Sequence, residues 1–256
     1  MEQKVYNLLI LDESGSMEVI KRKAVSGLNE TLQTIKSASK EHLEQKHYVS
    51  LITFNSERIW KAMDRMPVDS MTDLGWNDYS PRNATPLFDA MGQSLMELKE
   101  HVDEQDVVLV TIITDGLENA SKEYNGAVIK RLVAELRKKG WVFAYIGTNQ
   151  DVDAVADNLG IRSRMHYDYS SRGTSEMFEK ELKSRRFFYH ELACENRNIF
   201  NEDADYFRLG DEEVKNQQVD DKKKDVPSKP SSNTQKEAPT PEKGLGFWGK
   251  VKNFMK

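Results

Sequence analysis

Three short polar turns carry the side chains that are best suited to chemistry in this chain of 256 residues. Each turn offers carboxylate or hydroxyl oxygens, which are the ligands that hard divalent cations such as Mg²⁺ prefer. Ser, Thr and Asp are also common helix caps and turn residues, so each turn taken alone has a purely structural interpretation. The side chains concerned are Asp12, Ser14 and Ser16 in the first turn, Thr85 in the second and Asp115 in the third.

Apolar runs precede two of these turns and predict buried strands. Leu8–Leu11 leads into the first turn, and Val107–Ile113, the most β-branched run in the chain, predicts a central strand buried on both faces. In an open α/β sheet, ligands bind beyond the carboxyl ends of the strands. We therefore expect the polar turns to lie at the edge of the sheet where chemistry takes place. Apolar residues between Ile20 and Ile35 recur at helical spacing and predict an amphipathic helix after the first turn.

The next segments predict a hairpin and a long loop. His47–Phe54 and Arg58–Ala62 are β-prone and are joined by a short turn, as in an antiparallel hairpin at the sheet edge. Met63–Ala84 contains Pro, Gly, Asp and Asn without a sustained period, which indicates a surface loop. Thr85 and Pro86 then predict the start of a helix, with Thr85 as its cap.

The second half of the chain continues the alternation of helices and strands. We predict a helix capped by Ser121 and stopped at Gly140, a strand over Trp141–Ile146, a short helix over Asp151–Leu159 closed by Gly160, an edge strand over Met165–Tyr169 and a last helix over Thr174–Phe188. The fold class is therefore α/β, with a doubly wound, mainly parallel sheet, one antiparallel edge strand and helices on both faces.

The order and spacing of the three turns resemble the von Willebrand factor type A domain. The metal-ion-dependent adhesion site of that family combines D-x-S-x-S in a first loop, a Thr in a second and an Asp in a third, and this sequence matches all five positions. The resemblance covers roughly Lys4 to Phe188 and implies that Asp12, Ser14, Ser16, Thr85 and Asp115 are metal ligands. It also implies an Mg²⁺ (or Mn²⁺) ion whose last coordination position accepts an Asp or Glu side chain of a protein partner. Stand-alone intracellular members, mostly bacterial, are often adaptors for stress-response or tellurite-resistance systems or for ATPase machines, and the sequence does not choose among them.

Four further residues near the motif have less certain roles. We expect Glu13, at a variable position of the motif, to point to solvent or to rim the site, and Gly15 to shape the backbone of the loop. Asn83 and Glu118 are candidates to hydrogen-bond the metal ligands, although ordinary loop polarity explains them equally well.

An enzyme that uses Asp12 is the alternative interpretation. Receiver domains and dehalogenase-like phosphatases also place an Asp phosphoacceptor after a buried strand, but the dehalogenase pattern has a second Asp where Ser14 stands. The residues around Ser14 do not form a G-x-S-x-G nucleophile elbow. The five histidines are scattered and lack zinc-ligand spacing. The sequence therefore favours a binding module over a catalyst.

Composition limits the compartment and the partners. The net charge of -5 argues against nucleic-acid binding, which usually needs an excess of Lys and Arg. The single cysteine, Cys194, cannot form an internal disulfide, which is compatible with a reducing cytosol. Neither a secretory signal nor an apolar run of about 20 residues is present, so we expect a soluble cytoplasmic protein.

The composition changes near Gly210 and divides the chain into three predicted parts. Residues 1–210 form the α/β domain, and residues 211–243 form a polar linker with too few apolar residues to fold. Residues 244–256 carry aromatic and lysine side chains at helical spacing. Phe247–Met255 is thus a candidate to bind a second partner or an anionic membrane surface, or it is an inert tail.

Overall fold

Strands and helices alternate along the chain in a computed structural model that describes residues 2–148, 151–200 and 204–208. The strands are β1 (Gln3–Asp12), β2 (Gln45–Asn55), β3 (Arg58–Pro67), β4 (Val107–Thr114), β5 (Val142–Gly147) and β6 (Ser163–His166). The helices are α1 (Lys21–Glu41), α2 (Leu87–Lys99), α3 (Gly126–Lys138), α4 (Val152–Leu159) and α5 (Ser171–Ala193). Three short 3-10 helices are η1 (Gly15–Ile20), η2 (Val68–Ser70) and η3 (Arg197–Phe200).

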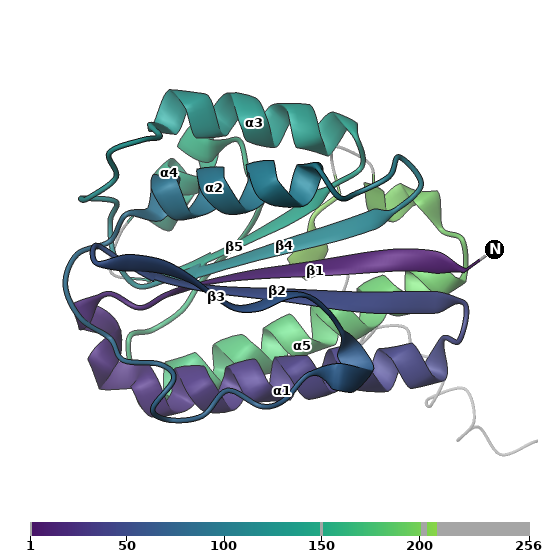
Figure 1. Cartoon of the computed structure of the whole chain (residues 1–256), viewed down its shortest axis with the longest axis horizontal. Helices are drawn as coiled ribbons and strands as arrows, with labels where there is room; N and C mark the ends of the chain where they lie inside the picture. The colour runs from purple at the N-terminus through teal and green to yellow at the C-terminus, as the bar shows by residue number, and fades with distance from the viewer. Residues whose placement is uncertain (1, 149–150, 201–203, 209–256) are drawn as a thin grey trace, which may run out of the picture.

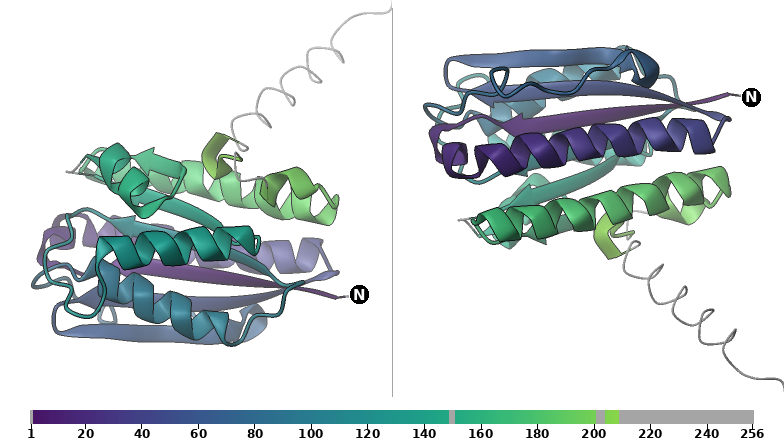
Figure 2. Two further views of the ribbon diagram at one scale, coloured as in Figure 1. Left: turned by 90° about the horizontal axis from the view of Figure 1, so that it is seen from above. Right: turned by 90° about the horizontal axis from the view of Figure 1, so that it is seen from below.

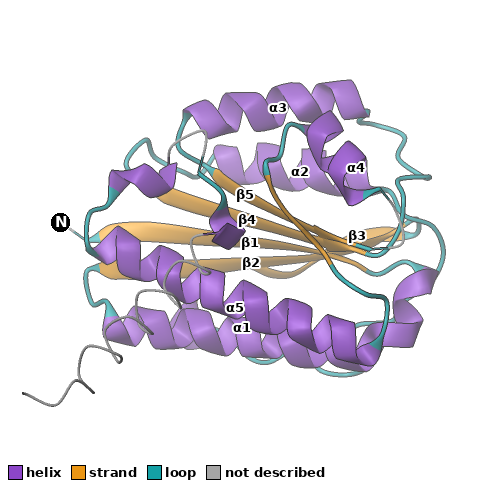
Figure 3. Ribbon diagram, turned by 180° about the vertical axis from the view of Figure 1, so that it is seen from behind, coloured by secondary structure: helices purple, strands orange, loops and turns teal. Residues whose placement is uncertain are grey.

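One six-stranded sheet with the order β3-β2-β1-β4-β5-β6 runs through the middle of the molecule (Figure 1). Every neighbouring pair of strands is parallel except β2 and β3, which form the antiparallel hairpin at one edge. Helices α1 and α5 cover one face of the sheet, and α2, α3 and α4 cover the other (Figures 1 and 3). The predicted fold class, including the antiparallel edge strand, is confirmed.

The position of β1 between two layers of helices explains why its apolar run is almost continuous. Val5 and Leu9 belong to the core under α1 and α5, whereas Leu8 and Ile10 belong to the core under α2 and α3. Successive side chains of a strand point to opposite faces, so a strand covered on both sides needs apolar residues at both sets of positions. Figure 2 looks onto the two faces of the sheet in turn, with α2 and α3 in front of the strands in one view and α1 and α5 in front in the other.

The hairpin is longer than the sequence predicted. Strand β3 continues past Ala62 to Pro67, so the predicted loop from Met63 to Ala84 was wrong at its beginning. The pairing of β3 with β2 shifts register between Val49 and Leu51, and Arg65 in β3 has a left-handed backbone with φ of 44°. With these irregularities the strand continues through its polar residues. Proline has no backbone N–H to donate to a neighbouring strand. Because β3 lies at the edge of the sheet, it tolerates Pro67.

The predicted helix caps were wrong for a related reason. Thr85 does not cap α2, which begins two residues later, and the side chain of Ser121 instead accepts a hydrogen bond of 3.0 Å from the backbone N–H of Asp89 in that helix. Helix α3 is capped by Asn125, whose side chain accepts from the N–H of Val128 at 3.1 Å. A residue from a distant loop thus satisfies the first turn of α2, and local sequence patterns cannot predict such a contact.

The last elements differ from the prediction in length. Strand β6 ends at His166, so Tyr169 lies in the connection to α5, and α5 extends beyond the predicted helix to Ala193. Helix α4 ends at Leu159, and Gly160 closes it as predicted, with a left-handed backbone at φ of 72°. No helix in the described ranges has the length and apolar character needed to cross a membrane. The predicted linker 211–243 and the segment 244–256, including Phe247–Met255, lie outside the described residues.

Candidate metal centre

Asp12 lies at the carboxyl end of β1 and is held by hydrogen bonds to both oxygens of its carboxylate. Its side chain is completely buried. Oδ1 accepts from the backbone N–H of Ser14 at 2.7 Å, and Oδ2 accepts from the hydroxyl of Thr114 at 2.6 Å. These contacts come from the adjacent strand end and from the turn itself, so the position of this carboxylate is determined by the sheet.

Hydroxyl and carboxylate oxygens from three loops converge next to Asp12. The hydroxyl of Ser16 donates to Oδ1 of Asp115 at 2.7 Å and lies 3.2 Å from the hydroxyl of Ser14. A methyl group placed on Gly116 would lie 3.4 Å from Oγ1 of Thr85 and 3.8 Å from Oγ of Ser16, so Thr85 belongs to the same cluster. The structure therefore brings together all five residues that the sequence singled out, from three separate segments.

The two carboxylates of the cluster lie in an environment that disfavours their charge. Burial raises the pKa of Asp12 to about 6, in spite of the hydrogen bonds from Thr114 and Ser14. Burial also raises the pKa of Asp115, whose buried Oδ2 atom has no hydrogen-bond partner among the described residues. In the described part of the chain, neither carboxylate pairs with a Lys or Arg. A cation at this position would compensate both charges.

The chemistry of these donors fits a hard divalent cation. Three hydroxyls and two carboxylates supply oxygen atoms only, as Mg²⁺ or Mn²⁺ prefers. Among the described residues there is no group of three or more His, Cys, Asp or Glu side chains that could hold a metal ion. Any ion in this cluster would depend on Ser14, Ser16 and Thr85 as well as on the two carboxylates.

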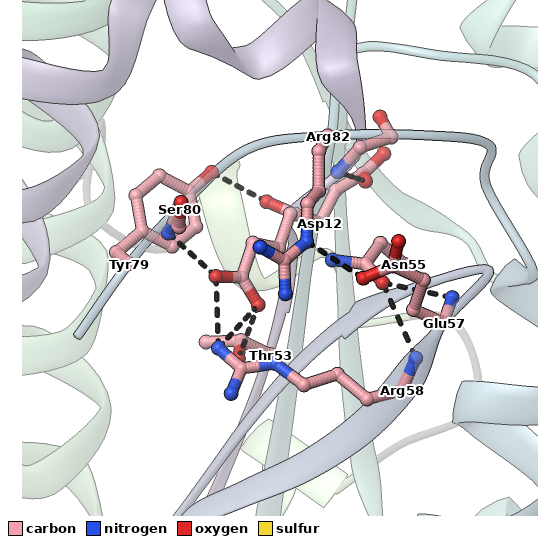
Figure 4. A network of polar contacts seen from close by, with 10 residues as sticks. Asp12, Thr53, Asn55, Glu57, Arg58, Tyr79, Ser80 and Arg82 are labelled. Carbon is pink, nitrogen blue, oxygen red and sulfur yellow. Dashed lines mark hydrogen bonds and ion pairs between the residues drawn. The ribbon is translucent and has the colours of Figure 1, made fainter. Parts of the chain in front are cut away.

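Glu13 does not point to solvent, which was one of the two orientations predicted for it. It is completely buried, and its carboxylate accepts hydrogen bonds from the hydroxyl of Thr53 at 2.9 Å and from the backbone N–H of Ser80 at 2.6 Å. The guanidinium of Arg58 also binds it, at 3.2 and 3.3 Å (Figure 4). Because alternate residues of a strand end face opposite sides, the position after Asp12 points away from the serine hydroxyls and toward the hairpin. Glu13 therefore connects the first loop, the hairpin and the loop before α2.

Backbone contacts strengthen the same connection. The N–H of Arg82 donates to the carbonyl of Glu13 at 2.9 Å, and the N–H of Gly15 donates to the carbonyl of Asn83 at 3.0 Å. Asn83 has a left-handed backbone with φ of 62°, whereas Gly15 does not, so the conformation expected to need glycine occurs at Asn83. The side chain of Arg82 pairs with Glu57 of the hairpin turn at 2.8 Å.

Glu118 orders a neighbouring loop. Its carboxylate accepts from the N–H of Phe88 at 2.9 Å and from the N–H and hydroxyl of Ser121, both at 2.7 Å. The residue that contacts the predicted ligand Thr85 is Asn119, whose side chain accepts from the N–H of Thr85 at 2.8 Å. The prediction that Glu118 hydrogen-bonds a metal ligand is not matched by its contacts.

Three tyrosines that sequence reasoning missed surround the cluster. The hydroxyl of Tyr79 donates to the carbonyl of Asp12 at 2.5 Å, and that of Tyr169 donates to the carbonyl of Ser16. Tyr167 is buried close to both carboxylates, and its hydroxyl has no partner in the described part of the molecule. Burial raises the pKa of all three phenols, that of Tyr169 to about 12, so all three stay protonated at neutral pH. Only Thr114, adjacent to Asp115, offered a sequence signal for the surroundings of the site.

Comparisons with known proteins give similarity in structure. No protein-family model and no curated protein sequence matches this chain. A variant of the PilB minor pilin from Streptococcus sanguinis has a TM-score of 0.51 at 11% identity, over 77% of this chain and 64% of that chain. The pilus adhesin SpaC from Lactobacillus rhamnosus GG, in an open conformation, has a TM-score of 0.51 at 14% identity, over 73% of this chain and 30% of that chain.

A protein named as von Willebrand factor type A from Catenulispora acidiphila aligns with a TM-score of 0.48 at 9% identity, over 72% of this chain and 43% of that chain. The chain thus spans less than two thirds of each of these three proteins. Identities this low concern the fold alone, and the function has to be argued from the site.

Proposed function

We propose that this protein is a metal-dependent protein-interaction module of the von Willebrand A type, an adaptor that binds an acidic side chain of a partner. Asp12, Ser14, Ser16, Thr85 and Asp115 hold Mg²⁺ (or Mn²⁺), directly or through water. Because only two of the five donors are charged, the bound ion retains enough positive charge to attract an Asp or Glu of the partner. Its place among cytoplasmic bacterial adaptors of the stress or tellurite-resistance type is part of the same proposal.

The convergence of oxygen donors around two buried carboxylates carries this proposal. Isolated caps would face their own helices, but here the hydroxyl of Ser16 spans two loops to reach Asp115. Oδ2 of Asp115 finds no hydrogen-bond partner in the part of the chain that the structure describes, which supports a ligand at this point, because buried polar atoms are rarely left without a partner. A cation would coordinate that atom. Its positive charge would also offset the cost of burying the carboxylate of Asp12, which raises the pKa of that group to about 6.

The alternative of a phosphatase that uses Asp12 has less support. A nucleophilic carboxylate needs one oxygen free to attack phosphorus. Both oxygens of Asp12 accept short hydrogen bonds, from the N–H of Ser14 and the hydroxyl of Thr114. We therefore propose a binding role and not a catalytic one.

Calorimetric titration of the full-length protein with MgCl₂ and with MnCl₂ tests the proposal. The wild type is expected to bind one equivalent of metal, and Asp12→Ala is expected to lose this binding. At a metal concentration of about 100 times Kd, binding to the folded state alone stabilises the wild type by about 2.7 kcal/mol. Chemical denaturation with and without EDTA measures this second effect independently.

Glu135→Gln is the matched control, because Glu135 is an acidic residue of α3 that pairs with Lys99 at the surface. It should bind metal as the wild type does. Equal metal binding by the wild type and Asp12→Ala would refute the metal site. A generic aryl phosphate that is hydrolysed by the wild type and not by Asp12→Asn would instead support the phosphatase.

A further inference from the structure

A cavity of about 700 Å³ opens next to the metal-site cluster. It is formed by the 3-10 helix η1, the first turn of α1 and the loop that contains Trp76, with Ser171 at the start of α5 on its other side. Helix η1 begins at Gly15, between the two serines of the first loop. A partner segment bound at the cluster can therefore extend along η1 into this cavity.

Three consecutive cations line the cavity. These cations are Lys21, Arg22 and Lys23, and the lining of the cavity contains only one acidic residue, Glu18. This local excess of positive charge contrasts with the net charge of -5 of the whole chain. None of the three cations forms an ion pair with another of the described residues. They lie in the first turn of α1, which has no acidic residue, and cations are unfavourable at this end of a helix. Their position is thus poor for the stability of the helix and suited to an external anion.

Exposed apolar side chains accompany these charges. Val19 is 75% exposed and Trp76 is 52% exposed, and both line the same cavity. The guanidinium of Arg22 lies 6.0 Å from the ring centre of Trp76, which leaves the rest of the indole surface accessible. Trp76 also lines a second cavity, of about 520 Å³, which continues between α1 and Leu182 of α5. Large exposed aromatic residues beside cations are typical of the residues that dominate binding at protein interfaces.

We infer that this cavity is a docking surface for an acidic segment of a partner protein, which places further Asp or Glu residues against Lys21, Arg22 and Lys23 and an apolar residue against Trp76. The inference deepens the proposed function, because the same segment would supply the carboxylate for the metal. It also assigns specificity. The metal recognises one carboxylate in any context, whereas the basic cavity selects the segments in which that carboxylate has acidic and apolar neighbours.

Two fluorescein-labelled peptides test the surface in anisotropy titrations with the full-length protein. Both carry Leu-Asp-Leu at the centre, one between pairs of glutamates and the other between pairs of lysines. In MgCl₂ the acidic peptide is expected to bind about tenfold more tightly than the basic one, and this preference should shrink at high salt. Lys21→Glu with Lys23→Glu should abolish the preference, and Trp76→Ala should weaken both peptides by about tenfold.

Lys40→Glu is the matched control, since Lys40 is exposed in the last turn of the same helix. It should retain the preference. Equal binding of the two peptides by the wild type, or an unchanged preference after reversal of Lys21 and Lys23, would overturn the inference. Tighter binding of a single-stranded oligonucleotide than of the acidic peptide would overturn it as well.

The outcomes for the surface and for the metal site are separable. The variants of Lys21 and Lys23 should bind Mg²⁺ at least as tightly as the wild type in calorimetry, because these side chains are outside the cluster and the added negative charge favours a cation. If the metal site fails, EDTA and Asp12→Ala will leave peptide binding unchanged while the preference for acidic neighbours persists. If the docking surface fails, binding will depend on metal without a preference for either peptide.

Discussion

Replacement of Glu13 by Gln tests whether the buried carboxylate holds the loops of the site together. The substitution keeps the shape of the side chain and removes its charge. Three donors lose an ionised acceptor, namely the hydroxyl of Thr53, the N–H of Ser80 and the guanidinium of Arg58. The amide group of Gln also directs N–H groups at one of these donors, which leaves at least one of them unsatisfied.

The expected cost follows from these contacts. A hydrogen bond to a charged group contributes about 1.5–3 kcal/mol, but the Arg58 side chain is 37% exposed and its contribution is reduced by solvent. We therefore expect Glu13→Gln to lower the free energy of unfolding by about 2–4 kcal/mol. Arg58→Met should cost less, and a double-mutant cycle should give a coupling of about 1–2 kcal/mol between the two residues.

Urea denaturation followed by circular dichroism measures these values. The control is Glu57→Gln, which breaks the exposed ion pair with Arg82 in the same region and should cost less than about 0.5 kcal/mol. We also expect Glu13→Gln to weaken Mg²⁺ binding by about tenfold, because the loop that leads to Thr85 loses its anchor. A cost for Glu13→Gln no larger than that for Glu57→Gln would refute the reasoning.

Three further predictions concern pH, packing and charge. Burial lowers the pKa of His47 to about 3, so the unfolded chain binds a proton there that the folded one does not, and the contribution of His47 to stability should fall by about 2 kcal/mol from pH 7 to pH 5, against the opposite contribution of Asp12, whose pKa is raised. His47→Gln should lose this pH dependence in urea titrations, and an unchanged slope would contradict the assignment. A methyl group on Gly27 would lie 2.1 Å from the ring of Phe178, so Gly27→Ala should destabilise α1 against α5 by about 1–3 kcal/mol in the same assay. Gly126→Ala, where the nearest contact is 3.5 Å, should not be destabilising. Asp12→Asn should be more stable than the wild type in EDTA at pH 7, because the raised pKa of the carboxyl makes its ionisation unfavourable to folding, and lower stability there would argue against this cost.

The sequence alone predicted the alternation of strands and helices and the three polar turns. This was possible because these properties are local. The run Val107–Ile113 is apolar on both faces of its strand, and Asp12 and Asp115 each follow such a run directly. Parallel strands place their carboxyl ends at one edge, so the strand pattern was sufficient to predict that the turns of Asp12 and Asp115 would be close together, whereas Thr85 was assigned to the same site by the family resemblance.

Contacts between segments far apart in the chain were decided by the tertiary structure. Glu13 is buried because Thr53, Arg58 and Ser80 arrive beside it from a hairpin and a loop 40 to 67 residues away. Ser121 satisfies the first turn of α2 across 32 residues, so its local resemblance to a cap for the following helix was misleading.

The surroundings of the candidate site depend on the fold in the same way. Tyr79 and Tyr169 reach the first loop across 67 and 153 residues, and no pattern near Asp12 announces them. The sequence determined which side chains are capable of binding a metal, because residue type and position after a strand are written locally. The tertiary structure alone decided which groups bury, orient and border them, because these contacts exist only after distant segments have packed.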